Sequence, residues 1–186
     1  MMEGEENLKR MKIRALFPGT FDPIHYGHID IAHRAAQLFT EVVVAVYDRP
    51  LKSLLFSPED RLSMVELAFT DIPNIRVMGY NGLTVKFCEE IGAKVIVRGL
   101  RIFSDFEHEF RMALTNSHLT PGIEVVALIT SEQHMFISST TVREVASLDG
   151  DVSSMVPPHV AQYVKKRFEG EHNEPLKMNY VTSLRD

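Results

Sequence analysis

The chain has 186 residues, of which 45 % are hydrophobic and 24 % charged, and its 20 basic and 25 acidic side chains give a net charge of −5 at pH 7. This length suits one domain that buries a core without cross-links. The acidic balance argues against a nucleic-acid-binding protein, which needs a basic face, but it allows a local basic cluster around a small phosphorylated ligand. The single cysteine, Cys88, excludes an intramolecular disulfide and a thiolate-rich metal site, and its helix-forming neighbours favour a buried thiol.

The two ends of the chain differ from its middle. Residues 1–10 are polar and carry no apolar signal region, so we expect a flexible tail there. Residues 11–168 are expected to form the domain, and residues 169–186 to form a C-terminal extension without sustained periodicity. No run reaches the length of a membrane span, so we expect a cytoplasmic protein with no membrane partner.

Strand patterns and helix patterns alternate along the domain. The expected strands are short apolar runs, and the expected helices carry apolar residues three or four positions apart. Ser57 and Pro58 are typical of a helix start, and Gly92 of a helix end. The expected strands are 13–17, 41–47, 75–78, 95–97 and 125–129, and the expected helices are 28–39, 58–69, 84–91, 105–119, 139–148 and 158–168. This alternation predicts an α/β fold, a doubly wound Rossmann-like five-stranded parallel sheet with helices on both faces.

Polar groups suited to phosphate follow four of the five expected strands. In such a fold, ligands bind beyond the carboxyl ends of the strands, where these segments meet. The segments are PGTFDPIHYGH (18–28), DRPLKS with Lys52, RGLRIFSDFEHE with Arg98 and Arg101, and the hydroxyl run Ser138–Thr141. Their convergence on one rim predicts a site for a phosphorylated ligand.

Each segment also has a simpler interpretation. The hydroxyl run alone favours a helix cap, although a cap and an anion site are compatible. Arg98 and Arg101 are either solvated charges or partners of a polyphosphate, and their place after an apolar strand favours the second. Lys52 alone is a weak signal.

His25 and His28 raise the question of a metal site. Their spacing suits ligation, but no third ligand is evident, so we expect no metal bound by protein side chains. Gly27 would let the backbone approach a ligand, and His28 near the helix start would donate a hydrogen bond to developing negative charge. The sequence has no GxGxxG, no Walker lysine motif and no GxSxG elbow, which argues against dehydrogenases, P-loop kinases and α/β hydrolases.

These motifs resemble a known group of enzymes. HYGH (25–28) and ISSTT (137–141) are similar to the two signatures of the nucleotidylyltransferase superfamily. Within it, PGTFDPIHYGHIDI, RPLK, VIVRGLRIFSDFEHE and FISST resemble the bacterial phosphopantetheine adenylyltransferase family, over residues 12–168. RGLR followed by DFEHE is the most specific part of this match.

The resemblance implies a reaction and a set of site residues. The family joins ATP and 4'-phosphopantetheine into dephospho-coenzyme A and pyrophosphate by direct in-line attack, uses Mg²⁺, and assembles as a homohexamer, a dimer of trimers. His28, Lys52 and Arg101 would stabilise the reacting phosphate. Thr20, Lys52, Thr84 and Arg98 would bind the acceptor. The residues that would bind ATP are Thr20, Phe21, His28, Gly99, Leu100, Arg101, Glu109, His134, Met135, Phe136, Ile137, Ser138, Ser139 and Thr140.

Four positions depart from the family pattern, namely Ser53, Thr84, His108 and His134. They affect the expected contacts with the pantetheine arm and the packing of adenine.

Two alternative functions stay open. The first is a nucleotidylyltransferase with another acceptor, such as nicotinate mononucleotide or glycerol 3-phosphate, against which the RGLR and DFEHE segments argue. The second is a catalytically silent nucleotide-binding module.

Overall fold

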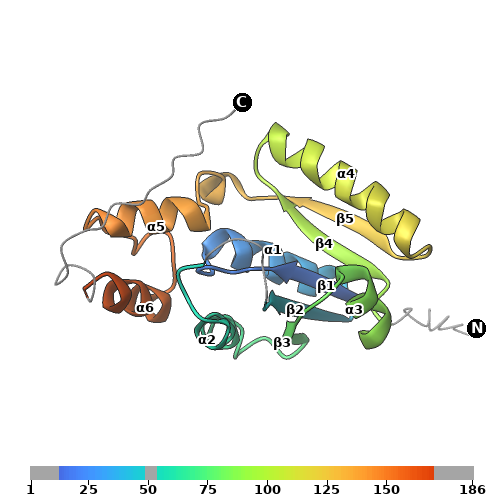
Figure 1. The fold of residues 1–186 in the computed structure, drawn as a ribbon, viewed down its shortest axis with the longest axis horizontal. Coiled ribbons are helices and arrows are strands. Elements are labelled where there is room, and N and C mark those ends of the chain that lie inside the picture. The colour runs from blue at the N-terminus through green and yellow to red at the C-terminus, as the bar shows by residue number, and fades with distance from the viewer. Residues whose placement is uncertain (1–12, 49–53, 170–186) are drawn as a thin grey trace, which may run out of the picture.

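The computed structural model describes residues 13–48 and 54–169 (Figure 1). These residues form the strands β1 (Arg14–Gly19), β2 (Glu41–Tyr47), β3 (Ile75–Tyr80), β4 (Val95–Leu100) and β5 (Glu124–Ile129). They also form the helices α1 (Tyr26–Leu38), α2 (Pro58–Ala68), α3 (Thr84–Ile91), α4 (Phe103–Leu119), η1 (Glu132–His134), α5 (Ser139–Ser147) and α6 (Pro158–Glu169). The predictions for the tail 1–10, for Lys52 and Ser53, and for 170–186 lie outside the described residues.

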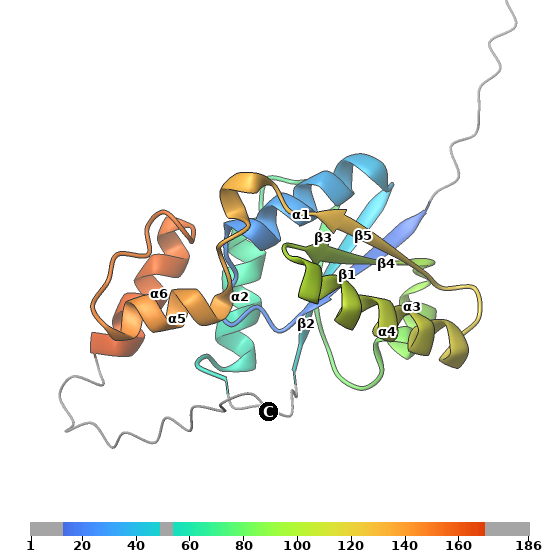
Figure 2. The ribbon, with the colours of Figure 1, turned by 90° about the horizontal axis from the view of Figure 1, so that it is seen from above.

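The described strands form one parallel sheet in the order β3-β2-β1-β4-β5. Figure 2 shows α1 on one side of this sheet, and α3 and α4 on the other. The predicted fold class is therefore confirmed. The chain runs outward from β1 to β3 and then returns to the other side of β1 as β4, so the switch point lies between the carboxyl ends of β1 and β4.

Both faces of the central strands β1 and β2 are buried. Alternate side chains of a strand point to opposite faces, so they enter two different cores. Val42, Val44 and Val46 belong to a core with α1, α2, α5 and α6, whereas Val43 and Ala45 belong to a second core that includes α3. Cys88 of α3 is fully buried in this second core, as predicted, and burial raises the pKa of its thiol to about 11.

Several element bounds differ from the prediction, and two of the differences affect the site. β4 continues to Leu100, because Arg98 and Gly99 still pair with Ala127 and Leu128 of β5. Arg98 is thus inside a strand rather than just after one. Pairing is a property of the backbone, so a charged side chain at the end of an apolar run does not stop it.

The second difference concerns the start of α1, which is at Tyr26, two residues before the predicted start at His28.

The predicted caps are confirmed for α2, where Ser57 accepts a hydrogen bond from Asp60 N at 3.1 Å, and for α3, which ends at Gly92 in the left-handed conformation. None of the helices within 13–48 and 54–169 is long and apolar enough to cross a membrane.

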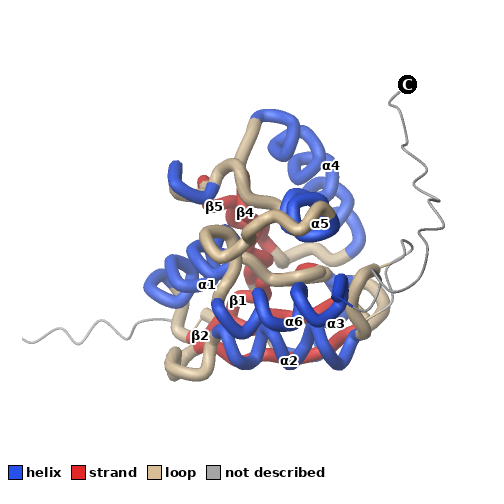
Figure 3. The backbone as a smooth tube through the Cα atoms, turned by 90° about the vertical axis from the view of Figure 1, so that its left-hand side faces the viewer, coloured by secondary structure: helices blue, strands red, loops and turns tan. Residues whose placement is uncertain are grey.

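The helices α5 and α6 lie together at one end of the molecule, which faces the viewer in Figure 3. Ile137, Val142 and Ala146 join them to the core that α1 and α2 form with the sheet. The start of α5 therefore lies near the carboxyl ends of the strands.

Candidate active site

A cleft of about 430 Å³ opens at the carboxyl ends of β1 and β4, beside the starts of α1, α4 and α5. This is the switch point of the sheet, where ligands of doubly wound folds bind. Of the predicted site residues, those lining it are Thr20, Phe21, His28, Arg98, Gly99, Arg101, Glu109, Ser138 and Ser139.

Arg98 of β4 and Glu109 of α4 form a two-pronged ion pair inside the cleft. Arg98 Nε donates to Glu109 Oε2 at 2.7 Å, and Arg98 Nη2 donates to Glu109 Oε1 at 2.5 Å. Arg98 Nη1 also donates to the carbonyl of Pro18 at 3.1 Å. The pair thus fixes the plane of the guanidinium beside the end of β1.

Arg101 lies between β4 and α4 and is held by the first turn of α4 and by the second signature. Its Nε and its main-chain N donate to Asp105 Oδ2 at 3.2 Å and 3.1 Å, and its Nη1 donates to the carbonyl of Ile137 at 3.2 Å. A cation is therefore oriented where α4 and the loop before α5 meet. Neither arginine is a free solvated charge, so the simpler interpretation of both is wrong.

The His28 imidazole lies between Phe21 and His25. The Phe21 ring meets it edge-on with centroids 5.0 Å apart, and the His25 ring stacks on it with centroids 3.6 Å apart. Burial, together with the charges of Arg101 and Arg98, lowers the pKa of His28 to about 3. His28 is therefore a neutral imidazole at pH 7, a hydrogen-bond donor rather than a cation.

The pKa of His25 is also lowered well below its ordinary value, by burial first and then by His28 and Arg101. Gly27 makes room for this ring: a Cβ at Gly27 would lie 3.1 Å from His25 Nδ1. Gly27 also lines the cleft, so our expectation that its backbone approaches a ligand stays a prediction, and the close packing of His25 is a second reason for glycine at this position.

The start of α5 combines a helix cap with hydroxyls that line the cleft. Ser138 Oγ accepts a hydrogen bond from Thr141 N at 3.0 Å, which confirms the predicted cap. Ser139 lines the cleft and donates from its Oγ to the carbonyl of Pro23 at 2.9 Å. The remaining amides of the first turn suit an anion.

The other predicted site residues within the described chain do not line this cleft. Thr84 lies at the start of α3, with its hydroxyl 3.1 Å from Tyr80 Oη. Leu100 ends β4, and Ile137 is buried, with its carbonyl on Arg101. His134 stacks on Tyr26, and three others lie exposed at or just before the start of α5, namely Met135, Phe136 and Thr140.

The sequence analysis missed three residues that organise the cleft from behind, namely Asp22, Arg61 and Arg143. Asp22 and Arg61 are 1 % exposed, and Arg143 donates to Asp22. A charged residue on a helix is normally read as solvated, so Arg61 and Arg143 gave no signal. Asp22 lies within the PGTFDPIHYGH segment, and that position was the available signal.

The comparisons with known proteins agree with this geometry. Residues 16–145 match the family model described as cytidylyltransferase-like, a class of nucleotidyltransferase. A structure from Vibrio parahaemolyticus described as a nicotinate-nucleotide adenylyltransferase covers 83 % of this chain and 99 % of its own, with a TM-score of 0.64 and 22 % identity. At that identity, the likeness concerns the fold alone. Fold and cleft together define a Rossmann-like nucleotidyltransferase.

Closer relatives narrow this class. Curated proteins named phosphopantetheine adenylyltransferase are 50 % identical in Aquifex aeolicus, over 83 % of this chain and 96 % of theirs, and 49 % identical in Chloroflexus aggregans, also over 83 % and 96 %. One from Herpetosiphon aurantiacus is 47 % identical over 83 % of this chain and 94 % of its own. The chain belongs to the phosphopantetheine adenylyltransferase family.

Proposed function

We propose that the protein transfers AMP from ATP to 4'-phosphopantetheine, giving dephospho-coenzyme A and pyrophosphate. The observation that carries this proposal is the cleft itself. Around it, His28, Arg98 and Arg101 meet the hydroxyls of Ser138 and Ser139. The sequence identity of 47–50 % to relatives with this name supports the choice of acceptor.

The reaction needs positioning and charge stabilisation rather than a nucleophilic side chain. A phosphate oxygen of 4'-phosphopantetheine attacks the α-phosphorus of ATP, a new P–O bond forms, and the bond to pyrophosphate breaks. The attacking phosphate is already anionic, so no general base is required.

Four side chains have proposed roles in that step. The neutral imidazole of His28 donates a hydrogen bond to the oxygens that gain charge. Arg101, oriented by Asp105 and Ile137, neutralises phosphate oxygens of ATP. Lys52 keeps its proposed role at the acceptor phosphate but lies outside the described residues. Arg98, oriented by Glu109, faces the acceptor side with Thr20.

Mg²⁺ belongs to the proposal as the partner of ATP. No group of three or more His, Cys, Asp and Glu is placed to hold a metal ion in the described parts of the chain. Asp105 and Glu109 line the cleft but pair with Arg101 and Arg98, so an ion that arrives with ATP would be held chiefly by the substrate phosphates. When bound, the ion would neutralise phosphate charge.

A different acceptor is the second candidate. The fold is shared with a protein described as a nicotinate-nucleotide adenylyltransferase, although at only 22 % identity. A panel of acceptors separates the two: pyrophosphate release with 4'-phosphopantetheine alone is the expected result, and release only with nicotinate mononucleotide or glycerol 3-phosphate would contradict the proposal. Calorimetry that finds tight ATP binding but no turnover with any acceptor would support the silent module.

We also propose that the protein is a homohexamer, as the family resemblance implies. The face of α4 supports self-association, because α4 has no buried residue and exposes large apolar side chains. These are Phe103, Phe106, Phe110, Met112 and Leu114. Exposed apolar patches of this kind typically mark protein interfaces. A cytoplasmic location is part of the same proposal, and cell fractionation tests it.

The decisive experiment is a coupled pyrophosphate assay with both substrates. We expect release only when ATP, Mg²⁺ and 4'-phosphopantetheine are all present. Release from ATP alone, or none with the complete mixture, would overturn the proposal.

A further inference from the structure

Arg61 of α2 is a buried cation whose hydrogen bonds within 13–48 and 54–169 go to main-chain carbonyls. It is 1 % exposed, which is rare for arginine unless its donors are matched. Its Nη1 donates to the carbonyls of Thr20 at 2.7 Å and Tyr47 at 2.8 Å. Its Nε donates to Phe56 at 3.3 Å, and its Nη2 donates to Asp48 at 3.4 Å. One side chain thus joins three separate segments.

These carbonyls have a common position in the molecule. Thr20 lines the cleft directly after β1. Tyr47 is the last residue of β2, and Asp48 is the last residue described before position 54. Phe56 follows shortly after the chain is described again at residue 54. Arg61 therefore holds described residues on both sides of 49–53, and it holds Thr20 at the same time.

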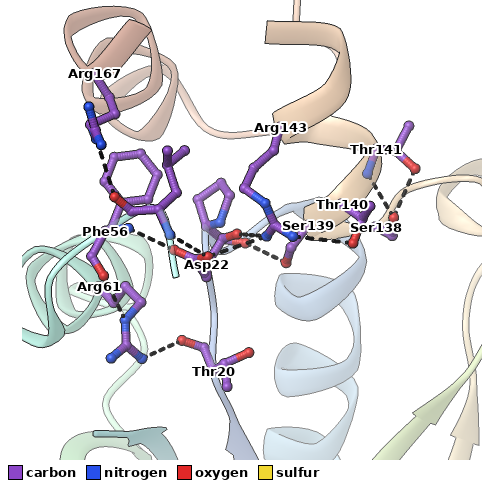
Figure 4. Close-up of polar contacts among 12 residues, drawn as sticks. Thr20, Asp22, Phe56, Arg61, Ser138, Ser139, Thr140, Thr141, Arg143 and Arg167 are labelled. Carbon is purple, nitrogen blue, oxygen red and sulfur yellow. Dashed lines mark hydrogen bonds and ion pairs between the residues drawn. The ribbon is translucent and has the colours of Figure 1, made fainter. Parts of the chain in front are cut away.

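Asp22 completes this arrangement from the other side. Its carboxylate is 1 % exposed and accepts hydrogen bonds from Leu55 N at 2.9 Å and Phe56 N at 3.0 Å (Figure 4). It also accepts from Arg143 Nη1 at 3.3 Å. The main chain of Phe56 is thus held at its N–H by Asp22 and at its carbonyl by Arg61.

The residue between these two anchors has a strained backbone. Phe21 has φ 49, a left-handed conformation that is costly for an aromatic residue and persists where its surroundings fix it. Its neighbours are Thr20, held by Arg61, and Asp22, held by Leu55 and Phe56. The Phe21 ring packs against His28, so the anchors reach the reacting group through this ring.

Arg143 of α5 anchors the other half of the site. Besides binding Asp22, its Nη2 donates to Thr140 Oγ1 at 3.3 Å (Figure 4). Ser139 of the same turn donates to Pro23. The ISSTT segment (137–141) is thus joined to the loop after β1 by contacts distinct from those of Arg61.

We propose that Arg61 is a positioning residue for the acceptor half of the site, and that Arg143 plays the corresponding part for the nucleotide half. The names of the two halves rest on the proposed function. Arg61 holds Thr20 and the described residues on either side of 49–53, whereas Arg143 holds Thr140 and the start of α5 and, through Asp22, also braces the loop after β1. Small misplacements of such groups cost about 10²-fold in rate.

Two conservative variants test this proposal. Arg61→Lys keeps the charge but has a single nitrogen in place of the three that donate here, so it cannot replace the Nε, Nη1 and Nη2 bonds together, and we expect kcat/KM for 4'-phosphopantetheine to fall about 10²-fold while the Kd of ATP stays near the wild-type value. Arg143→Lys should show the opposite pattern, with weaker ATP binding and a smaller effect on acceptor binding. Calorimetry gives each Kd separately, and Arg61→Met serves as the stronger variant where it folds.

Arg14→Lys is the matched control. Arg14 bonds Glu41 and the carbonyl of Ile91, at the amino end of β1, away from the cleft. It should lower Tm without changing either Kd. If Arg61→Lys behaves in the same way, or weakens both substrates equally, the positioning role is wrong.

If the proposed function is wrong, the wild-type protein itself will not bind 4'-phosphopantetheine, which distinguishes that outcome from a failure of the positioning proposal. Amide hydrogen exchange decides the anchoring role in that case. The amides of Leu55 and Phe56 should exchange faster in Arg61→Lys than in Arg14→Lys when the two variants are compared at equal global stability. Equal exchange at these amides would overturn the proposal.

Discussion

The imidazole rings of His25 and His28 stack with centroids 3.6 Å apart and an interplanar angle of 24°, and the Nδ1 atoms of both are buried. Two imidazolium rings cannot share this arrangement, since they would be like charges in contact without water. The stack therefore needs neutral rings.

This finding leads to a prediction for stability against pH. The pKa of His28 is about 3 in the folded chain against an ordinary value of 6.5, because of burial and the nearby Arg101 and Arg98. Between these two values the unfolded chain binds a proton that the folded chain does not. The contribution of His28 to the free energy of unfolding should thus be fully present above about pH 6.5. It should be lost as the pH drops toward 3, by up to about 1.4 kcal/mol per pH unit for each proton.

Urea unfolding between pH 7 and pH 4 measures this slope. His28→Asn should show a shallower fall than the wild-type protein. The exposed His33 on the same helix offers the control, and His33→Asn should keep the wild-type slope. Equal slopes for wild type and His28→Asn would contradict the buried neutral state.

His28→Ala tests the catalytic role. Loss of one preorganised donor typically costs about 10²–10³ in kcat, so we expect that loss with a much smaller change in the Kd of ATP. His28→Asn keeps an N–H donor and should recover part of the rate. Steady-state pyrophosphate release and ATP calorimetry give both numbers, and an unchanged kcat in His28→Ala removes this residue from the mechanism.

The Arg98–Glu109 pair tests whether the cleft is preorganised. A double-mutant cycle with Arg98→Met and Glu109→Gln should give a coupling of roughly 1–2 kcal/mol in unfolding free energy, because the pair is two-pronged and partly buried. Lys165 and Glu169 of α6 form an exposed pair at 3.5 Å, for which the same cycle should give less than about 0.5 kcal/mol. Equal couplings would mean that the cleft pair is as weak as a surface pair.

Two helix caps separate stability from binding. Ser57 and Ser138 each cap a helix, and removing either hydroxyl should cost about 1 kcal/mol of stability. Only Ser138 lines the cleft, so Ser138→Ala should also weaken ATP binding, whereas Ser57→Ala should not. Thermal unfolding and ATP calorimetry of both variants check this, and equal ATP affinities would limit Ser138 to capping.

The apolar face of α4 tests the assembly. Phe106 is 49 % exposed, and its ring stacks on Phe110 with centroids 5.9 Å apart. Phe106→Lys should shift the protein to smaller species in light scattering, because a charge would be buried at the interface. Leu67 of α2, which is 52 % exposed, provides the control variant Leu67→Lys, expected to leave the mass unchanged. A wild-type monomer would contradict the hexamer outright.

Much of the fold was predictable from local patterns. The β-branched run at 41–47 predicted β2 with its observed bounds, since a strand buried on both faces is apolar throughout. The start of α1 was less predictable, because His25 and Tyr26 are polar or amphipathic and carry no helix-start signal. The end of β4 depended on its pairing with β5, which no local window contains.

By itself, the sequence determined the fold class, three of the segments that form the cleft and nine of the residues that line it. Hydrophobic periodicity and motif spacing are local properties of the chain, so they can be read without coordinates. Only the tertiary structure decided which charges meet. Arg61 reaches Thr20 across 41 positions and Tyr47 across 14, and Arg98 meets Glu109 only because α4 folds back over β4. Such pairings depend on how the elements pack, and for that reason the role of Arg61 became visible in the folded chain alone.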